Sequence, residues 1–260
     1  MFSSAPSTAP SRSPISDLMS TSAEPAPRAE PAPSAQPAAR FDAVALKRGT
    51  HHQVLRGASF TLSPGTFHLL MGPEGSGKTS ILRLLCLAER PTSGLVQLFG
   101  RDVATLSRKE TELTRRRIGA ALEPQVFLDH LTVWDNAALV PRIVGRQVGD
   151  YQGEVDAVLK WLGLAKLADA TPRKLSPSER YRLAIARAVV NRPEMVLVDE
   201  PESGLDEAAR ARVLKCLWEL HGAGVTIVLA TRDETLAAAS RLPALRLQDG
   251  RTTLVEPRGR

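Results

Sequence analysis

The chain has 260 residues, a length that allows one or two domains, and 43% of them are hydrophobic, as in ordinary globular proteins. No apolar run approaches the ~18 residues that a membrane-spanning helix needs. The net charge of +6 suits anionic partners such as nucleic acid or lipid headgroups, but without a clustered basic tract a plain solvated surface is the favoured interpretation. The only cysteines, Cys86 and Cys216, lie in separate apolar stretches, which indicates core packing in a reducing compartment and not a disulfide framework.

Residues 1–40 consist mainly of Ala, Pro, Ser and Thr and contain few large apolar side chains. Such a segment cannot bury enough apolar surface to offset the entropy that it loses on ordering. It also lacks the continuous apolar core of a secretory signal. We therefore expect a disordered tail over 1–40, followed by a folded domain over 41–256.

Strands and helices are expected to alternate along the rest of the chain. Residues 41–46 alternate in hydrophobicity like an edge strand, and 133–169 look helical with breaks at Pro141, Gly145 and Gly149. The other expected strands are 58–62, 67–71, 95–99, 118–122, 195–198, 225–230 and 244–248, and the other expected helices are 81–88, 107–117, 178–190, 207–221 and 233–240. This order predicts an α/β fold with a largely parallel core sheet.

One stretch matches the phosphate-binding pattern G-x-x-x-x-G-K-[ST], between the apolar strand 67–71 and an apolar helix. In this context the glycines let successive backbone N–H groups face a polyphosphate, and the helix adds its positive N-terminal end. We expect Lys78 to reach the β- and γ-phosphates and the Thr79 hydroxyl to bind Mg²⁺. The flanking pattern disfavours the alternative, a glycine-rich turn with an incidental lysine. The predicted nucleotide-binding residues here are Gly72, Pro73, Glu74, Gly75, Ser76, Gly77, Lys78, Thr79 and Ser80.

The apolar strand 195–198 ends in two carboxylates, Asp199 and Glu200. The strand places Asp199 at the carboxyl edge of the sheet beside the phosphate loop, where it can hold Mg²⁺ through water. Glu200, one residue further on, points elsewhere and can polarise an attacking water. Asp-Glu after a strand is common by chance, but the phosphate loop in the same chain favours a functional role for this pair.

The order of the motifs resembles that of the nucleotide-binding subunits of ABC transporters over essentially 41–255. These motifs are the phosphate loop, Leu-Ser at 175–176, Val-Asp-Glu-Pro at 198–201, Ser-Gly-Leu-Asp at 203–206 and Ala-Thr-Arg-Asp at 230–233. Other stretches, such as Val-Trp-Asp-Asn at 133–136, are similar to the FtsE family of cell-division ATP-binding proteins. The resemblance implies a P-loop NTPase domain of ABC type, with a mainly parallel core sheet, an antiparallel β subdomain and a helical subdomain at about 124–190.

The same resemblance implies a head-to-tail homodimer that sandwiches two ATP molecules with Mg²⁺. The dimer would act in cell division by docking on an integral membrane, permease-like partner, FtsX-like in the FtsE family, from the cytoplasmic face of the inner membrane. Contact with an anionic membrane surface would suit the basic charge. Nucleic acid is not expected, because DNA-associated ABC ATPases usually carry coiled-coil or zinc insertions and none interrupts this sequence.

The sequence departs from the family where the γ-phosphate is sensed. The Mg²⁺- and water-sensing glutamine matches Glu123, an acceptable oxygen ligand for Mg²⁺ that adds negative charge near the γ-phosphate. The switch histidine matches Arg232, which can hold the γ-phosphate as an arginine finger does, or bind it in the ground state without helping attack. The resemblance thus gives Glu200, Arg232 and Glu123 as catalytic residues, and Thr79, Asp199 and Glu123 as metal ligands.

Two further departures concern other contacts of the nucleotide. The adenine-stacking aromatic matches Arg48, whose guanidinium can stack on a base by a cation–π contact. His51 or His52 could take that role, and Arg48 could equally be a plain loop residue. Glu74, inside the phosphate loop, places a carboxylate near the phosphates where small polar residues are usual.

The signature loop, normally Leu-Ser-Gly-Gly, is replaced by Ser176, Pro177, Ser178 and Glu179 after a leucine. From the residues alone, Ser176 is a helix N-cap, Pro177 sits at N1 and Glu179 at N3 completes a capping box, which explains the segment without ATP. The helix end could still attract an opposing γ-phosphate. However, Pro177 has no N–H to donate, and Ser178 restricts a backbone that glycine leaves free.

Groups that grip nucleotide and metal in cis are therefore present, whereas groups that sense the γ-phosphate or reach it across the dimer are altered. Loss of one transition-state donor typically costs about 10²–10³ in rate. The leading hypothesis is an FtsE-like ATPase subunit that binds ATP tightly and hydrolyses it slowly. One alternative is a non-hydrolysing ATP-gated scaffold of the same fold, which turnover would distinguish. Another is the ATPase of a lipoprotein or macrolide export transporter, which the neighbouring permease gene would identify.

Overall fold

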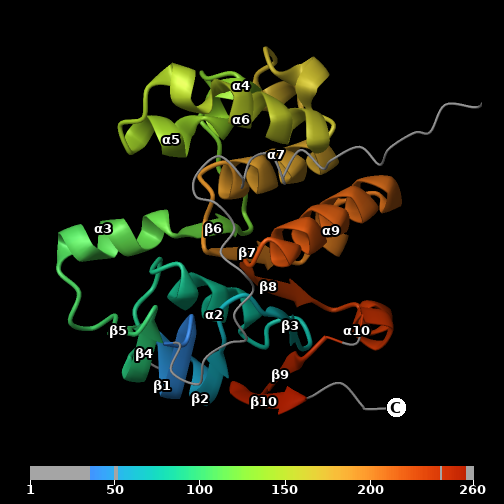
Figure 1. The fold of residues 1–260 in the computed structure, drawn as a ribbon. Coiled ribbons are helices and arrows are strands. Elements are labelled where there is room, and N and C mark those ends of the chain that lie inside the picture. The colour runs from blue at the N-terminus through green and yellow to red at the C-terminus, as the bar shows by residue number, and fades with distance from the viewer. Residues whose placement is uncertain (1–35, 50–51, 241, 256–260) are drawn as a thin grey trace, which may run out of the picture.

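The computed structural model describes residues 36–49, 52–240 and 242–255, so most of the tail predicted at 1–40 lies outside the described residues. Two sheets form the lower part of the molecule in the view of Figure 1, and a group of helices lies above them. The folded domain begins with β1 (Ala39–Arg48), close to the predicted boundary at Phe41. Within these ranges, none of the helices has the length and apolar character needed to cross a membrane.

The core is a six-stranded sheet in the order β10-β9-β3-β8-β7-β6. Its parallel strands are β3 (Phe67–Met71), β6 (Ile118–Ala121), β7 (Met195–Asp199), β8 (Thr226–Thr231) and β9 (Ala244–Gln248), and β10 (Arg251–Val255) adds an antiparallel edge. Every residue of β3, β7 and β8 is buried, as expected for strands that are covered on both faces. The predicted α/β fold with a largely parallel sheet is confirmed.

The second sheet is antiparallel and has the order β2-β1-β4-β5. Its other strands are β2 (His52–Leu62), β4 (Ser93–Leu98) and β5 (Arg101–Asp102). β1 pairs with β2 on one side and with β4 on the other, so the expectation of an edge strand at 41–46 is wrong. The alternation arises because one face of β1 is buried, where Phe41 stacks on Phe60 with ring centroids 4.4 Å apart, and the other face is exposed.

Helices cover both faces of the core sheet. α2 (Lys78–Leu85) shares one hydrophobic core with the core sheet and the antiparallel sheet. On the opposite face, α6 (Val148–Trp161), α7 (Pro177–Val189) and α9 (Glu207–Gly222) share the second hydrophobic core. α3 (Arg108–Arg116) precedes β6, the short α8 (Pro201–Gly204) follows β7, and α10 (Glu234–Ser240) precedes β9.

The region predicted as helical at 133–169 contains α4 (Val133–Ala137), α5 (Leu139–Ile143), α6 and the 3-10 helix η1 (Ala165–Leu167), and a second one, η2 (Pro172–Lys174), precedes α7. The break at Gly145 is confirmed, because this residue lies between α5 and α6 with φ of +84°. The breaks at Pro141 and Gly149 are wrong. Both residues lie in the first turn of a helix, where the backbone N–H has no intrahelical partner and proline is tolerated.

Candidate functional site

The phosphate loop joins β3 to α2. Gly77 caps α2 in the left-handed region, with φ of +106°, which glycine adopts without steric cost. Gly72 leaves no room for a side chain, because a Cβ there would lie 2.4 Å from the backbone oxygen of Leu247. The ammonium of the buried Lys78 folds back onto the loop and donates to the carbonyl oxygens of Gly72 at 2.7 Å and Pro73 at 2.9 Å. The phosphate loop thus supplies two carbonyl acceptors to the lysine at its own end.

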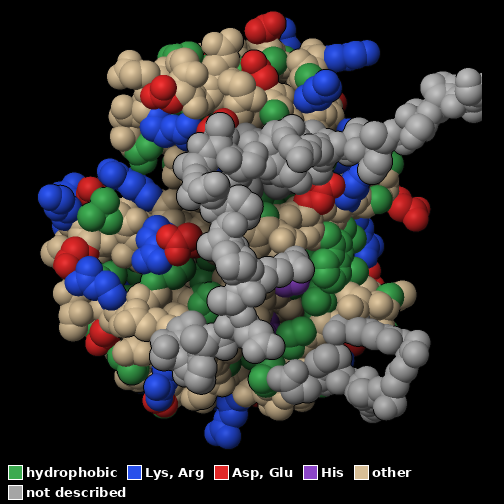
Figure 2. All heavy atoms as spheres, viewed as in Figure 1, with side chains coloured by type: hydrophobic (Ala, Val, Ile, Leu, Met, Phe, Trp, Pro, Cys, Tyr) green, Lys and Arg blue, Asp and Glu red, His purple; other side chains and the backbone are tan. Residues whose placement is uncertain are grey.

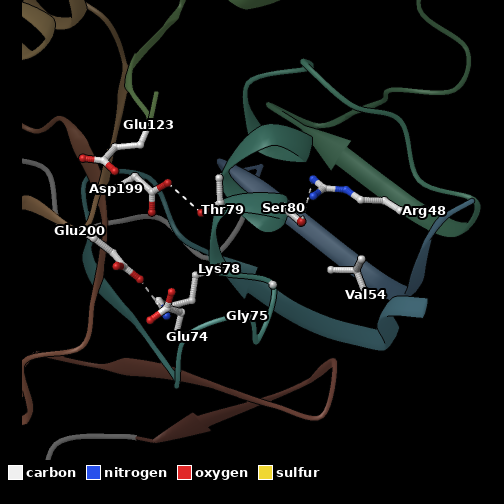
Figure 3. Close-up of a pocket in the computed structure, with 11 residues that line it drawn as sticks. Arg48, Val54, Glu74, Gly75, Lys78, Thr79, Ser80, Glu123, Asp199 and Glu200 are labelled. Carbon is white, nitrogen blue, oxygen red and sulfur yellow. Dashed lines mark hydrogen bonds and ion pairs between the residues drawn. The ribbon is translucent and has the colours of Figure 1, made fainter. Parts of the chain in front are cut away.

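A cavity of about 340 Å³ lies beside this loop (Figure 3). It is formed by the loop, the antiparallel sheet and the segments that follow β6 and β7. Its lining residues are Arg48, Val54, Glu74, Gly75, Gly77, Lys78, Thr79, Ser80, Glu123, Asp199 and Glu200. Most of the predicted nucleotide-binding and metal-binding residues therefore meet at one place. Pro73 and Arg232 line a neighbouring cavity, and residues 176–179 line neither.

Asp199, the last residue of β7, is only 2% exposed. Its Oδ2 accepts a hydrogen bond from the Thr79 hydroxyl at 2.8 Å, whereas its Oδ1 is buried without a hydrogen-bond partner in the part of the chain that the structure describes. Burial raises the pKa of Asp199, and the nearby Glu200 and Glu123 carboxylates raise it further. These oxygens fit Mg²⁺, because the ion prefers oxygen ligands and its charge would offset the cost of burying the carboxylate.

Glu200 follows Asp199 in the left-handed region, with φ of 42° and ψ of 62°. This conformation aims its carboxylate at Lys78 and away from the Thr79–Asp199 pair (Figure 3). One carboxylate oxygen lies 3.0 Å from the Lys78 ammonium and the other 2.6 Å from the Arg232 guanidinium. The expectation that the two adjacent carboxylates point in different directions is confirmed.

Arg232 follows β8 and reaches over the phosphate loop. Its guanidinium bonds Glu74 at 2.9 Å in addition to Glu200, so the loop carboxylate and the expected catalytic base share one arginine. Glu202 fixes the backbone beneath it: one carboxylate oxygen accepts from the Arg232 amide at 2.6 Å and from the Thr231 hydroxyl at 2.9 Å. The backbone of Arg232 is therefore held in place by Glu202.

The segment 176–179 begins α7 outside the cavity. The Ser176 hydroxyl accepts from the Glu179 amide at 3.3 Å, and the Glu179 carboxylate accepts from the Ser176 amide at 2.8 Å. Pro177 occupies the first helical turn, so the predicted capping box is confirmed. The Ser178 hydroxyl donates to Asp206 at 3.0 Å, the residue that caps α9. The side chains of Ser176, Ser178 and Glu179 therefore have hydrogen-bond partners within this chain.

Comparison with known proteins decides the family. Residues 55–203 match the ABC transporter family. The chain belongs to the ABC transporter family. It is 36% identical over 211 residues to the cell division ATP-binding protein FtsE of Escherichia coli K12, which covers 81% of this chain and 95% of that protein. It is 33% identical over 207 residues to FtsE of Bacillus subtilis, which covers 80% of this chain and 91% of that protein.

Other ABC proteins are also similar. The chain is 38% identical over 185 residues to the macrolide export ATP-binding/permease protein MacB of Chlorobium phaeobacteroides, covering 71% of this chain and 28% of that protein. The solved dimer of MJ0796, a bacterial ABC transporter cassette, superimposes with a TM-score of 0.79 at 26% identity, covering 85% of this chain and 100% of that one. The predicted P-loop NTPase fold of ABC type is thus confirmed, and the chain is an ABC-type ATPase.

Arg48, the residue predicted to lie at the adenine of the nucleotide, lines the cavity of this ABC ATPase. Its guanidinium donates to the Ser80 hydroxyl at 3.2 Å and pairs with Glu89 at 2.7 Å, and its side chain is 47% exposed. A stacking role for it stays a prediction. Of its two alternatives, His51 lies outside the described residues, and of His52 the structure describes the backbone in β2.

Three residues that hold predicted site residues of this ABC ATPase were not expected from the sequence. They are Glu89 at Arg48, Glu202 at Arg232, and Ser203, whose hydroxyl donates to Glu123 at 3.2 Å. Each contact joins positions that are 30 to 80 residues apart. No local pattern marks such partners, because only the assembled sheet brings them together.

Proposed function

We propose that this chain is the ATP-binding subunit of an FtsE-like membrane complex and that its ATP cycle drives or gates an integral membrane partner in cell division. The observation that carries the proposal is the hydrogen bond of 2.8 Å between Thr79 and the buried Asp199, beside a phosphate loop whose lysine contacts Glu200 at 3.0 Å. These are the groups that nucleotide binding and metal binding require in cis. The FtsE relatives, of which this chain covers 91–95%, support the division role.

The geometry gives each residue a task in hydrolysis. Thr79, Asp199 and Glu123 would hold Mg²⁺, which neutralises charge on the phosphates and orients them. Lys78 would exchange its carbonyl and carboxylate partners for phosphate oxygens. Glu200, released from Lys78, would accept a hydrogen bond from the attacking water and polarise it. Arg232, already 2.6 Å from Glu200, would stabilise charge at the γ-phosphate.

Hydrolysis is proposed to be slow. A head-to-tail homodimer, for which the dimeric MJ0796 cassette provides a precedent, would bring the N-terminus of α7 to the nucleotide of the partner protomer. There Pro177 has no N–H to donate, and the Ser178 hydroxyl is already bonded to Asp206. The same observation favours a second candidate, a scaffold of the same fold that is switched by ATP binding without turnover.

A groove between the core and the helical region is the proposed docking surface for the membrane partner. It holds a small cavity, and its lining residues on α3, β6, α5 and α7 include Arg116, Ile118, Val140 and Arg187. One helical turn from Arg116 and Val140 respectively, Leu113 on α3 is 47% exposed and Ile143 on α5 is 69% exposed. An apolar rim around arginines fits a short helix of an integral membrane subunit that presents apolar side chains and a carboxylate.

The surface charge near this groove indicates which side of the protein would face the membrane. Figure 2 shows Lys and Arg side chains gathered over α3, whose residues include Arg108, Lys109, Arg115 and Arg116. A basic helix beside the docking groove would face anionic lipid headgroups once the partner is bound. We therefore propose a peripheral location on the cytoplasmic face of the inner membrane.

Steady-state ATP hydrolysis by the purified protein tests the catalytic part, with Lys78→Ala and Glu200→Gln as variants and nucleotide binding measured in parallel. Turnover that both substitutions abolish would establish the ATPase site. ATP binding without turnover above that of the variants, also after the membrane partner is added, would favour the scaffold. MacB-like export would be supported instead if the neighbouring permease gene is of that type.

Co-purification with the candidate permease tests the docking part. We expect Leu113→Glu or Ile143→Asp to abolish co-purification while nucleotide binding is retained, because each places a charge on the exposed apolar rim. Leu254→Glu on β10, where the side chain is also exposed (46%) and is not among the groove residues, is the matched control. Equal loss in all three variants would contradict the assignment of the groove.

A further inference from the structure

Arg232 is shared by two carboxylates. One terminal nitrogen of its guanidinium lies 2.6 Å from Glu200, and the other lies 2.9 Å from Glu74. The two carboxylates differ in setting, because the Glu200 side chain is 18% exposed and that of Glu74 is 86% exposed. The Glu200 contact belongs to the hydrolytic site described above. The Glu74 contact has no part in it.

Glu74 sits at a position where its charge matters. It lies inside the phosphate loop and lines the same cavity as Lys78 and Thr79, so it faces the place where phosphates bind. A carboxylate there repels phosphate oxygens unless a cation lies between them. Arg232 supplies a cation that offsets the charge of Glu74, and their ion pair joins the segment after β8 to the loop across 158 positions of the chain.

We infer that Glu74 is a specificity-determining residue of this site: by holding Arg232, it lowers the preference of the protein for ATP over ADP. The inference rests on the proposed assignment of the cavity as the nucleotide site. Its physical basis is competition for one guanidinium. Glu74 and Glu200 hold the two terminal nitrogens in place, so the guanidinium cannot shift toward a γ-phosphate without loosening the Glu74 pair, whereas ADP has no γ-phosphate and leaves that pair intact.

As a consequence, the relative concentrations of ATP and ADP have a larger influence on which nucleotide occupies the site. The cost of breaking the Glu74–Arg232 pair falls on ATP alone, so the two nucleotides bind with more similar affinities than the phosphate loop would otherwise give. The pair is largely exposed, and exposed ion pairs contribute little. Its effect on the ratio of affinities is therefore expected to be modest, roughly three- to fivefold.

The test compares the affinities of Mg²⁺ with ADP and Mg²⁺ with a non-hydrolysable ATP analogue by calorimetry, in the wild type and in Glu74→Gln. We expect the substitution to tighten binding of the analogue by roughly three- to fivefold and to change binding of ADP by less than about twofold. Glu234→Gln is the matched control. Glu234 lies two residues beyond Arg232 and also pairs with an exposed arginine, Arg246, at 2.7 Å. It should leave both affinities unchanged.

A double-mutant cycle shows whether Glu74 acts through Arg232. In an Arg232→Gln background, Glu74→Gln should no longer alter the ratio of the two affinities. An unchanged ratio in the single variant would overturn the inference, and so would a gain that persists without Arg232, since direct repulsion would then explain it. Failure of the proposed site is recognised separately: the wild type would bind neither nucleotide, or Lys78→Ala would bind both as tightly as the wild type.

Discussion

The Thr79 hydroxyl donates to the Asp199 carboxylate at 2.8 Å, across 120 positions of the chain. The bond satisfies one oxygen of Asp199, and among the residues that the structure describes the other oxygen is buried without a hydrogen-bond partner. A buried carboxylate that is only half satisfied is costly to the folded state. A cation bound at this oxygen would remove that cost, so nucleotide with Mg²⁺ is expected to stabilise the protein by more than the phosphate contacts alone would.

Asp199→Asn is expected to remove most of the stabilisation by Mg²⁺ with a non-hydrolysable ATP analogue, because an amide cannot replace the charge of the carboxylate. A ligand at one hundred times its Kd stabilises by about 2.7 kcal/mol, which corresponds to a rise in Tm of roughly 5–10 °C for a domain of this size. Thermal unfolding with and without the ligand measures the effect. A rise in the variant equal to that of the wild type would contradict the metal assignment.

The same residue predicts a pH effect in the nucleotide-free protein. Burial raises the pKa of Asp199 above its ordinary value of 3.8, so the folded state keeps this proton to higher pH than the unfolded state does. Its contribution to stability is present below pH 3.8 and is lost as the pH rises through the raised pKa. Between about pH 4 and pH 7, the Tm of the wild type should therefore fall relative to that of Asp199→Asn. If the Tm of the two proteins changed in parallel with pH, the pKa of Asp199 would not be raised in the folded state, which would contradict the prediction.

Glu110 predicts the opposite sign. The Arg101 guanidinium and the Ser107 cap of α3 lower the pKa of Glu110 from 4.5 to about 2. A depressed pKa gives stability that is present above pH 4.5 and is lost as the pH falls toward 2. Glu110→Gln keeps the capping geometry and removes the charge, so its Tm should lie slightly below that of the wild type at neutral pH and meet it near pH 2. The difference is expected to be small, because the pair is exposed.

Local patterns predicted much of this molecule, and contacts between distant segments account for what they missed. The strand, glycine loop and helix around Lys78 and the capping box from Ser176 to Glu179 depend on neighbours within a few positions, and both are observed. The place of β1 between two strands has no local signal, because alternation reports one buried face and not which edges are paired. The partners of Arg232 at Glu74 and of Ser178 at Asp206 likewise depend on the assembled fold.

Glu154 is expected to be the most sensitive carboxylate for the stability of the helical region. It lies on α6 with its side chain 10% exposed, and it bonds Arg146 at 2.9 Å and Arg192, between α7 and β7, at 2.5 Å. Glu154→Gln would remove the buried negative charge that both half-buried arginines contact, at a cost of about 2–3 kcal/mol and a fall in Tm of roughly 5–10 °C. Glu112→Gln, which breaks the exposed pair with Arg108, is the control and should change stability by less than about 0.5 kcal/mol.

The proposed slow turnover leads to a gain-of-function prediction. Restoring glycine at 177 and 178 would return a backbone N–H to the N-terminus of α7 and free the backbone that Ser178 restricts. Because a single transition-state donor is typically worth about 10²–10³ in rate, the double variant Pro177→Gly with Ser178→Gly should raise steady-state turnover at least about tenfold, despite some loss of helix stability. Turnover is measured per protomer at a saturating ATP concentration and over a range of protein concentrations, since the effect requires a dimer.

Ser178→Ala separates the two causes that the double variant combines. Alanine removes the hydroxyl that bonds Asp206 but keeps a side chain at that position and leaves Pro177 in place. If the missing N–H and the restricted backbone limit turnover, Ser178→Ala should remain as slow as the wild type while the double glycine variant accelerates. Equal acceleration in both would show that the Ser178–Asp206 bond itself restrains the helix end. Unchanged turnover in both would place the limit elsewhere in the site, at Glu123 or Arg232, since these are the other positions predicted to replace γ-phosphate groups of the family.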